Sequence, residues 1–305
     1  MNKGILAVDL GGTNTKIGLF DSLKLTLVKE LVIATDTAAG PKAAAEKWLH
    51  ETAAWRKDFQ IEAMGIGSPG PLDCEKGMIL ETPNLKHWEN FSFTNFFKKN
   101  LGAPSFLEND ANCAALGEWH HHKVDDLIVI TLGTGVGTGV ISSGKLIRGV
   151  RGFGVEAGHM TIDMNGPRCE CGKFGCFEAL VGARLLVARY NQKSKTKIKD
   201  LDASTLFAKA KATGKEADPI ARDLAKLWTK ALAVAVGNLV NIFNPTLISL
   251  AGGVSHAFKE YESEFHKILL TEAFDTSLKC VNVSVSEIQE KAGLYGAAVW
   301  AKQQL

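Results

Sequence analysis

Short apolar runs that end at glycine recur along the chain. Residues 5–9 (ILAVD) and 127–132 (LIVITL) have the length and composition of buried β-strands. A glycine-rich turn follows each run, and a second strand-like run then covers 16–20 in the first case and begins at residue 140 in the second. The pattern predicts two β-hairpins, each with glycine at its turn.

A shift of 122 positions lays the second hairpin over the first. It aligns Asp9-Leu10-Gly11-Gly12-Thr13 with Thr131-Leu132-Gly133-Thr134-Gly135. The match is short, and two unrelated hairpins would also produce it. We favour an internal duplication, which predicts two similar α/β halves.

Strand and helix patterns alternate along the rest of the chain. We expect further strands at 63–66, 105–108 and 246–250, and helices at 41–55, from 109 onward, at 219–243 and at 293–301. Asp218 is a good N-cap before Pro219 at the first helical position, and Asn244-Pro245 ends that helix. This alternation predicts layered α/β structure.

Composition narrows the class of protein. The 305 residues suit one large domain or two ordinary ones, and 35 basic against 33 acidic residues are too balanced to indicate a nucleic-acid binder. No apolar run reaches the ~18 residues of a membrane span, and the N-terminus lacks a signal-peptide pattern. We therefore expect a cytoplasmic protein with neither a membrane nor a nucleic-acid partner.

Glycine turns follow three predicted strands, at 9–13, 131–137 and 250–253. Glycine lets backbone N–H groups approach an anion, and nearby hydroxyls can add donors to phosphate oxygens, namely those of Thr13, Thr15, Thr134 and Thr138. Lys16 either supplies positive charge or is a surface residue, and Asp9 is placed to hold Mg²⁺ directly or through water. Three such turns fit a nucleotide held between two domains, although one turn alone would indicate nothing.

A cluster of potential metal ligands follows the second hairpin. His159, Cys169, Cys171 and Cys176 match the ligand set of a tetrahedral Cys₃His zinc site. Because protein ligands would fill all four positions, such a zinc ion would be structural. The alternative is three reduced thiols that cluster by chance.

Acidic side chains near these segments are candidates for sugar chemistry. Asp110, at the end of a predicted strand, could take a proton from an attacking hydroxyl. Glu156 and Glu178 flank the cysteine cluster and could accept hydrogen bonds from a polyol, or each could be a surface salt-bridge partner. The polar stretch 117–126 is the expected domain junction, and we interpret His120, His121 and His122 within it as solvated surface rather than a metal site.

Together these motifs resemble the ROK sugar kinases of the actin-like/hexokinase ATPase superfamily. Asp9-Leu10-Gly11-Gly12-Thr13 and Leu132–Gly137 (LGTGVG) are similar to the two phosphate motifs, and Ala251-Gly252-Gly253 to the adenosine motif. Glu156-Ala157-Gly158-His159 is similar to the ExGH sugar motif. Residues 169–178 (CECGKFGCFE) fit the zinc signature CxCGxxGCxE, which is very specific.

The resemblance implies a two-domain, ribonuclease H-like (actin-like ATPase) α/β fold with an inter-domain cleft and a structural zinc loop. The smaller domain would cover 1–117 plus 294–305, and the larger 118–293. Asp110 would be the catalytic base. The sugar ligands would be Ser68, Pro69, Gly70, Asn84, Asn109, Asp110, Glu156, His159 and Glu178. The nucleotide ligands would be Asp9, Gly11, Gly12, Thr13, Lys16, Thr134, Gly135, Gly137, Gly252 and Gly253.

The reaction implied is transfer of a phosphoryl group from MgATP to a hexose hydroxyl, with O6 of glucose as the first choice, by a homodimer. N-acetylhexosamines, mannose and fructose remain alternative acceptors, and polyphosphate an alternative donor. The family also includes sugar-responsive repressors with a helix-turn-helix segment ahead of the first motif. Here that motif begins at residue 9, so we expect a kinase rather than a non-catalytic regulator.

Overall fold

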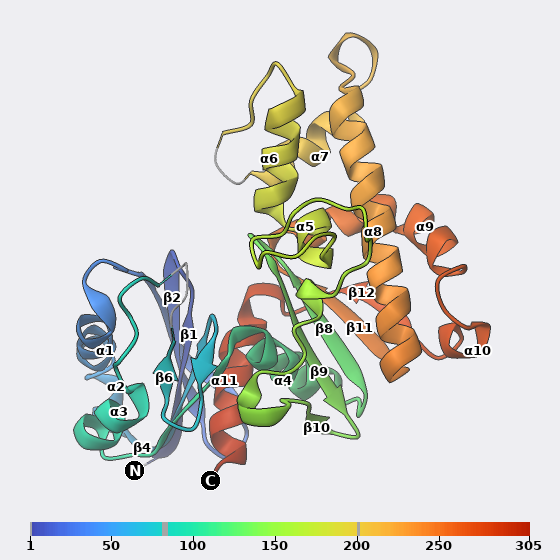
Figure 1. Ribbon diagram of the computed structural model, residues 1–305. Coiled ribbons are helices and arrows are strands. Elements are labelled where there is room, and N and C mark those ends of the chain that lie inside the picture. The colour runs from blue at the N-terminus through green and yellow to red at the C-terminus, as the bar shows by residue number, and fades with distance from the viewer. Residues whose placement is uncertain (1, 81–84, 200–201) are drawn as a thin grey trace.

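The structure is a computed structural model that describes residues 2–80, 85–199 and 202–305. Two five-stranded sheets form its framework, and helices pack on both (Figure 1). The α/β class predicted from the alternating pattern is confirmed.

The first sheet has the strand order β3-β2-β1-β4-β7. Its members are β1 (Asn2–Leu10), β2 (Asn14–Asp21), β3 (Leu27–Ala34), β4 (Phe59–Ser68) and β7 (Ser105–Asn109). β1 pairs antiparallel with β2 and parallel with β4, which in turn pairs parallel with β7. The predicted hairpin is present, and the edge strand β3 is an addition to the expected elements.

The second sheet repeats this arrangement in the order β10-β9-β8-β11-β12. Its members are β8 (Leu127–Leu132), β9 (Val136–Ser142), β10 (Lys145–Leu146), β11 (Leu247–Ala251) and β12 (Asn282–Val285). β8 and β9 form the antiparallel hairpin, and β11 is parallel to both β8 and β12. Since strands correspond one to one between the sheets, the prediction of two similar halves is confirmed in topology.

Helices connect and cover these strands. They are α1 (Gly40–Glu51), α2 (Trp55–Asp58), α3 (Phe93–Leu101), α4 (Asp110–His122), α5 (Phe177–Val181), α6 (Ala183–Lys193), α7 (Ala203–Lys211), α8 (Pro219–Phe243), α9 (Phe258–Leu269), α10 (Asp275–Leu278) and α11 (Ala292–Gln303). A small hairpin of β5 (Leu72–Asp73) and β6 (Met78–Ile79) lies between β4 and α3. The helix expected at 41–55 is divided at Thr52, whose hydroxyl donates to the Trp48 carbonyl (2.7 Å).

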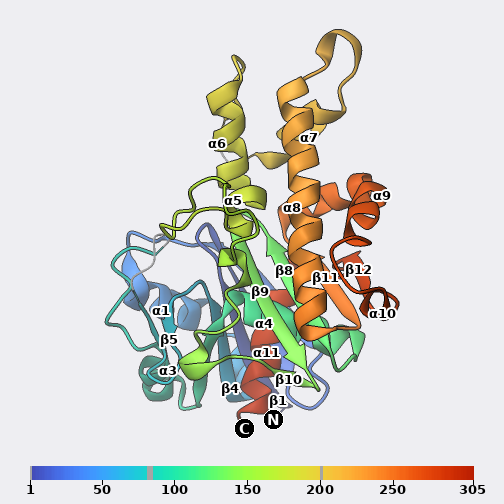
Figure 2. The same ribbon diagram turned by 45° about the vertical axis from the view of Figure 1, so that its right-hand side comes forward.

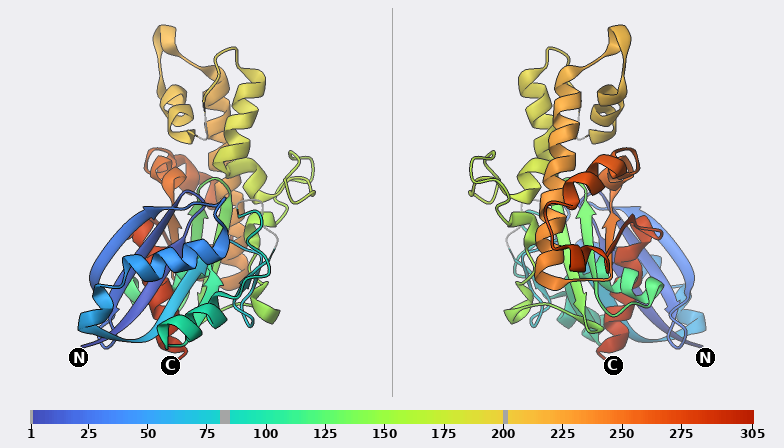
Figure 3. Two further views of the ribbon diagram at one scale, coloured as in Figure 1. Left: turned by 90° about the vertical axis from the view of Figure 1, so that its left-hand side faces the viewer. Right: turned by 90° about the vertical axis from the view of Figure 1, so that its right-hand side faces the viewer.

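The long helix α8 begins and ends as its sequence predicts. The Asp218 carboxylate accepts a hydrogen bond from the Ala221 N–H (3.0 Å), and Asn244 takes the left-handed conformation after the last turn. The first turns of α8 project with α6 and α7 beyond the sheets (Figures 2 and 3). Its later turns belong to the largest buried apolar cluster, together with β8 and β11.

Two helices cross between the halves. α4 follows the first sheet but packs on β8 and β9, whereas α11 follows the second sheet and packs on β1 and β4 (Figure 1). The helices also pack tightly on each other, because a Cβ at Gly296 would lie 1.6 Å from the Cys113 carbonyl oxygen. The final helix therefore packs on strands of the N-terminal half.

The expected domain junction begins inside one of these helices, since α4 continues through Gly117 to His122. The limits 1–117 with 294–305 and 118–293 therefore stay a prediction. None of the helices in the described ranges combines the length and apolar character that a bilayer span requires.

Candidate functional site

The first sheet brings three predicted site segments to one edge. β1, β4 and β7 are parallel, so their carboxyl ends lie together, and the strand register places Asp9 beside Gly67 and Ser68 beside Asn109. This edge therefore holds Asp9, Ser68 and the start of α4, where Asp110 lies.

Asp110 is the first residue of α4, and its neighbour caps that helix. The Asn109 side-chain oxygen accepts hydrogen bonds from the backbone N–H groups of Ala111 (2.9 Å) and Asn112 (3.2 Å). Asp110 Oδ1 also accepts from the Ala111 N–H (2.9 Å). Burial raises the pKa of the Asp110 carboxyl, and the hydrogen bond from Ala111 offsets part of that rise.

The second half contributes a further acid, Glu156, to the same place. Burial raises the pKa of the Glu156 carboxyl, the His159 ring lowers it, and the carboxylates of Asp110 and Glu178 raise it. Charges act strongly on one another only over short distances. Glu156 therefore lies within electrostatic range of His159, Asp110 and Glu178. The packing agrees, because a Cβ at Gly137, next to the Val136 N–H that bonds to Glu178, would lie 2.9 Å from the Ala111 Cβ beside Asp110.

Glu178 is fixed by two different segments. Its Oε2 accepts a hydrogen bond from the Val136 N–H (2.9 Å) in the second glycine turn, and the Cys169 thiol lies 3.8 Å from its Oε1. The same turn contacts the short helix Ala157–His159, since a Cβ at Gly158 would lie 2.2 Å from the Val136 carbonyl oxygen. The glycine turn thus supports both Glu178 and the ExGH segment.

The predicted zinc ligands are brought together. One ligand atom from each of His159, Cys169, Cys171 and Cys176 lies within 4.8 Å of all the others. The Cys171 and Cys176 sulfurs are 3.6 Å apart, and Cys169 Sγ is 3.7 Å from His159 Nδ1. Tetrahedral ligands on a zinc ion, with bonds of about 2.0–2.3 Å, would lie about 3.3–3.8 Å apart, and the Cys171–Cys176 and Cys169–His159 separations fall in that range.

The glycine turns lie open at the strand ends. A Cβ at Gly12, Gly133 or Gly253 would meet no other atom within 4 Å. Gly252 has φ +87°, and a Cβ there would lie 2.6 Å from the Leu132 carbonyl oxygen, which places the third turn beside the second. These backbone positions are free to face a ligand.

Asp9 and Lys16 lie near each other at the first turn. Burial raises the pKa of the Asp9 carboxyl to about 6, against the lowering effect of Lys16. Lys16 Nζ is 3.9 Å from Asp9 Oδ2 and donates a hydrogen bond to the Glu290 carbonyl (2.5 Å) just before α11. Lys16 is thus held between the halves rather than free on the surface.

Two predicted hydroxyl donors are turned away from the glycine turns. The Thr15 hydroxyl is buried and bonds to the Thr35 hydroxyl (2.7 Å), and the buried Thr138 hydroxyl donates to the Val155 carbonyl. The prediction that they face phosphate is therefore wrong, whereas Thr13 and Thr134 are exposed.

The structure describes some, but not all, of the loop residues predicted to line the sugar pocket. Ser68 is buried, and its hydroxyl donates to the Pro69 carbonyl (3.1 Å). Gly70 lies near the Asn109 side chain, because a Cβ there would be 3.6 Å from the Asn109 amide nitrogen. Asn84, with residues 82 and 83 of the same predicted loop, lies outside the described residues.

The histidine run at the end of α4 is less solvated than expected. His121 is exposed, but His122 is half-buried, and its Nε2 lies 3.1 Å from an oxygen of the fully buried Glu118. The surface interpretation therefore holds for His121 and is wrong for His122. The run takes no part in the metal-ligand cluster found in the described ranges.

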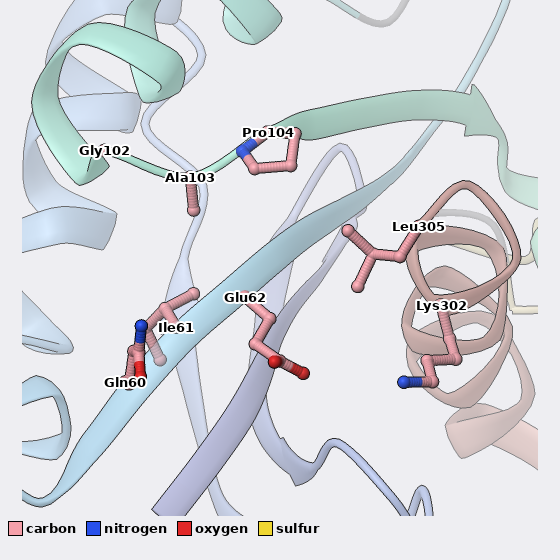
Figure 4. Close-up of a pocket in the computed structure, with 8 residues that line it drawn as sticks. All are labelled: Gln60, Ile61, Glu62, Gly102, Ala103, Pro104, Lys302 and Leu305. Atoms are coloured by element: carbon pink, nitrogen blue, oxygen red, sulfur yellow. The ribbon is translucent and has the colours of Figure 1, made fainter. Parts of the chain in front are cut away.

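A surface groove of about 560 Å³ lies away from this site (Figure 4). It opens at the beginning of β4, the end opposite Ser68, so it takes no part in the convergence described above. Its lining residues are Gln60, Ile61, Glu62, Gly102, Ala103, Pro104, Lys302 and Leu305.

The sequence pattern that defines the ROK family matches residues 5–304. The chain belongs to the ROK family. It is 32% identical to a glucokinase from Thermotoga maritima, over 99% of this chain and 98% of that protein. Among solved structures it is similar to a ROK hexokinase from Thermus thermophilus, with a TM-score of 0.86 and 31% identity over 99% and 98% of the two chains.

A second solved structure holds ligands. It is a ROK family glucokinase from Streptomyces griseus in complex with glucose and AMPPNP, with a TM-score of 0.75 and 27% identity over 98% of this chain and 99% of that chain. The predicted family resemblance is thereby confirmed, and the fold is that of ROK sugar kinases, in the actin-like ATPase class.

Proposed function

We propose that this chain is a glucokinase that transfers the γ-phosphoryl group of ATP to O6 of glucose. The observation that carries the proposal is that the second glycine turn contacts Ala111, beside Asp110, as well as Glu178 and the ExGH segment, which brings acids from both halves together. Several acceptors around one point suit a polyol, since each sugar hydroxyl is a hydrogen-bond donor. The Streptomyces griseus relative, which binds glucose and AMPPNP, supports the same substrate pair.

Asp110 is the catalytic base in this proposal. It would accept the proton of the glucose 6-hydroxyl as the oxygen attacks the γ-phosphorus of ATP and the bond to the β-phosphate breaks. Its raised pKa makes the carboxylate a better proton acceptor, while the N-terminus of α4 helps keep it ionised near neutral pH. Ser68, Pro69, Gly70, Asn84, Asn109, Glu156, His159 and Glu178 complete the proposed sugar site.

Backbone N–H groups and one carboxylate would serve the nucleotide. Gly12 and Thr13 in the first turn, with Thr134 and Gly135 in the second, offer donors to phosphate oxygens. The N–H groups of Gly11 and Gly137 already donate to the Asn14 carbonyl (3.0 Å) and the Thr131 hydroxyl (3.1 Å), so these two glycines would shape the turns around the phosphates. Asp9 suits the role of a magnesium ligand, because a cation beside it would offset the cost of burying its negative charge, which raises its pKa to about 6. Gly252 and Gly253 face the adenosine, and Lys16 stands beside the phosphates as a fixed positive charge.

The cysteine cluster would hold a structural zinc ion. With His159 Nδ1 on the side of Cys169, the other ring nitrogen is left to face the sugar. Zinc would then fix the loop that carries His159 and, because Glu178 follows the ligand Cys176 by two residues, the start of the segment that carries a second sugar ligand.

Two larger-scale features belong to the same proposal. The smaller domain (1–117 with 294–305) and the larger one (118–293) would close over the bound substrates and exclude water, which otherwise competes as acceptor. The chain would act as a homodimer.

A panel of acceptors tests this function. Glucose, N-acetylglucosamine, N-acetylmannosamine, mannose and fructose are each assayed with MgATP by coupled ADP release, and glucose also with polyphosphate as donor. We expect the highest kcat/KM for glucose with ATP. A higher value for another sugar would reassign the acceptor, and no turnover with any sugar would indicate a non-catalytic regulator.

A further inference from the structure

A fully buried carboxylate precedes the proposed base. Glu108, in β7, is 0% exposed, and its Oε1 accepts hydrogen bonds from the Asn109 N–H (3.0 Å) and the Asn112 side-chain amide (2.9 Å). It therefore ties the end of β7 to the first turn of α4, the turn that begins with Asp110. Burying a carboxylate is costly unless another charge compensates it.

The compensating charge comes from the other half of the molecule. Arg148, just after β10 in the second sheet, places its Nε 2.7 Å from Glu108 Oε2. The Arg148 guanidinium carbon also lies 4.7 Å from the centre of the Trp300 ring in α11. Cys74 lies nearby, and burial raises the pKa of its thiol to about 11, so it adds no negative charge beside Arg148.

The segment that begins at Arg148 leads directly to the proposed sugar ligands. The Gly154 N–H donates to the Arg148 carbonyl (2.8 Å), and the Thr138 hydroxyl donates to the Val155 carbonyl. The Ala157 N–H in turn donates to the Thr138 hydroxyl oxygen (3.1 Å). Arg148 is thus connected by short, hydrogen-bonded backbone to Glu156 and His159.

We propose that Arg148 and Glu108 are positioning residues that hold the Asn109–Asp110 pair in register with the Glu156–His159 segment. The inference rests on the proposed function, because it takes Asp110 as the base. Arg148 and Glu108 would act by holding the side chains of Asp110, Glu156 and His159 in place, and would not contact the substrate. Since misplacement of a reacting group by about 1 Å can cost about 100-fold in rate, kcat should suffer more than the KM for glucose.

A double variant separates positioning from simple stabilisation. Arg148→Met leaves the Glu108 carboxylate buried and unpaired, so it should lower both the Tm and kcat. Adding Glu108→Gln removes that charge and keeps an oxygen that can accept from Asn109 and Asn112. Stability should then return toward that of the parent, whereas the link between the halves stays broken.

The experiment measures Tm, kcat and the KM for glucose in the full-length parent, both single variants and the double variant. Arg222→Met is the matched control, because Arg222 is an exposed arginine of α8 whose guanidinium donates a hydrogen bond to the Ala212 carbonyl (3.1 Å). In the double variant we expect a Tm near that of the parent, a kcat at least about tenfold lower, and a KM within about threefold. The control should match the parent in all three.

Two results would overturn the inference: a double variant with kcat within about twofold of the parent, or single-variant losses fully explained by the unfolded fraction. Asp110→Asn is assayed alongside to test the proposed function separately. If Asp110→Asn is inactive while the double variant is normal, only the positioning role fails. If the parent does not phosphorylate glucose, or Asp110→Asn is fully active, the proposed function itself fails.

Discussion

The two glycine turns have the same place in the two sheets but different chemistry. Asp9 and Thr131 occupy equivalent positions at the ends of β1 and β8. The Thr131 hydroxyl accepts a hydrogen bond from the Gly137 N–H (3.1 Å) and so closes its own turn. The Asp9 carboxyl remains available, with a pKa raised to about 6 by burial. The comparison teaches that the two halves have the same strand topology, while equivalent positions carry polar residues with different roles.

The same division holds for the surrounding elements. The first half brings two acids, Asp9 and Asp110, to the ends of its parallel strands. The second half brings Glu156, His159 and Glu178 on loops that its own glycine turn and cysteine cluster support. Under the proposed function, the first half supplies the base and the metal ligand, and the second orients the sugar.

The largest effect is expected at the proposed base. Asp110→Asn keeps the shape of the side chain but removes its ability to take a proton, so kcat should fall by about 10²–10⁴-fold. Glucose binding, measured by calorimetry, should change by less than about tenfold, because the amide can still bond to a hydroxyl. An activity near that of the parent would remove Asp110 from the mechanism.

The next effect compares the equivalent positions directly. Asp9→Asn should lower kcat/KM for MgATP by about 100-fold, because it removes a charge that would act on the metal and the phosphates. Thr131→Val removes one hydrogen bond within the protein and should cost less than about tenfold. Equal losses in the two variants would contradict the separate tasks assigned to the two turns.

A smaller effect is expected at the cysteine cluster. The parent should contain about one zinc ion per chain by elemental analysis. Cys171→Ser should lose that ion, lower the Tm and raise the KM for glucose by about tenfold, because a disturbed ligand loop also moves His159 and Glu178. The matched control is Cys280→Ser, an exposed cysteine outside the cluster, which should keep both zinc and affinity. A fully active parent without zinc would refute the metal site.

The smallest effect concerns stability and pH. The pKa of Asp9 rises on folding from 3.8 to about 6, so ionisation of this carboxyl destabilises the folded state. This destabilisation is zero below pH ~3.8 and reaches its full size above pH ~6. Asp9→Asn should therefore be more stable than the parent at pH 7.5, by at most ~3 kcal/mol at about 1.36 kcal/mol per pKa unit. Solvent contact of the carboxylate will reduce that gain. Urea unfolding without nucleotide measures it, and a gain that persists unchanged at pH 4 would exclude this cause.

Much of the framework could be predicted because its signals are local. Continuous apolar runs identify β1, β8 and β11, and Asp218 with Asn244 marks both ends of α8. The edge strand β3 was missed because Val28 and Val32 are exposed among charged neighbours, a pattern that also suits a surface loop. The division of the first helix at Thr52, whose hydroxyl donates to the Trp48 carbonyl (2.7 Å), was not predicted from the helical spacing of apolar residues.

The site could be predicted where a spaced motif carries it. The Cys₃His spacing predicted a cluster of four ligand atoms that lie within 4.8 Å of one another, while the sugar-binding role of the Glu-Ala-Gly-His segment stays a prediction. A threonine beside a glycine turn looks the same whether it faces a ligand or a neighbouring strand, which is why Thr15 and Thr138 were misplaced. Glu108 and Arg148 are 40 positions apart in the sequence and belong to different halves, so no local sequence pattern predicts that they pair.

Identification of the product tests the central claim most directly. The chain is incubated with MgATP and ¹³C-labelled glucose, and ³¹P and ¹³C NMR spectra follow the phosphoryl group. The division of tasks between the two halves predicts glucose 6-phosphate and ADP in equal amounts. ADP without a sugar phosphate, phosphate on another glucose hydroxyl, or no product at all would contradict the account.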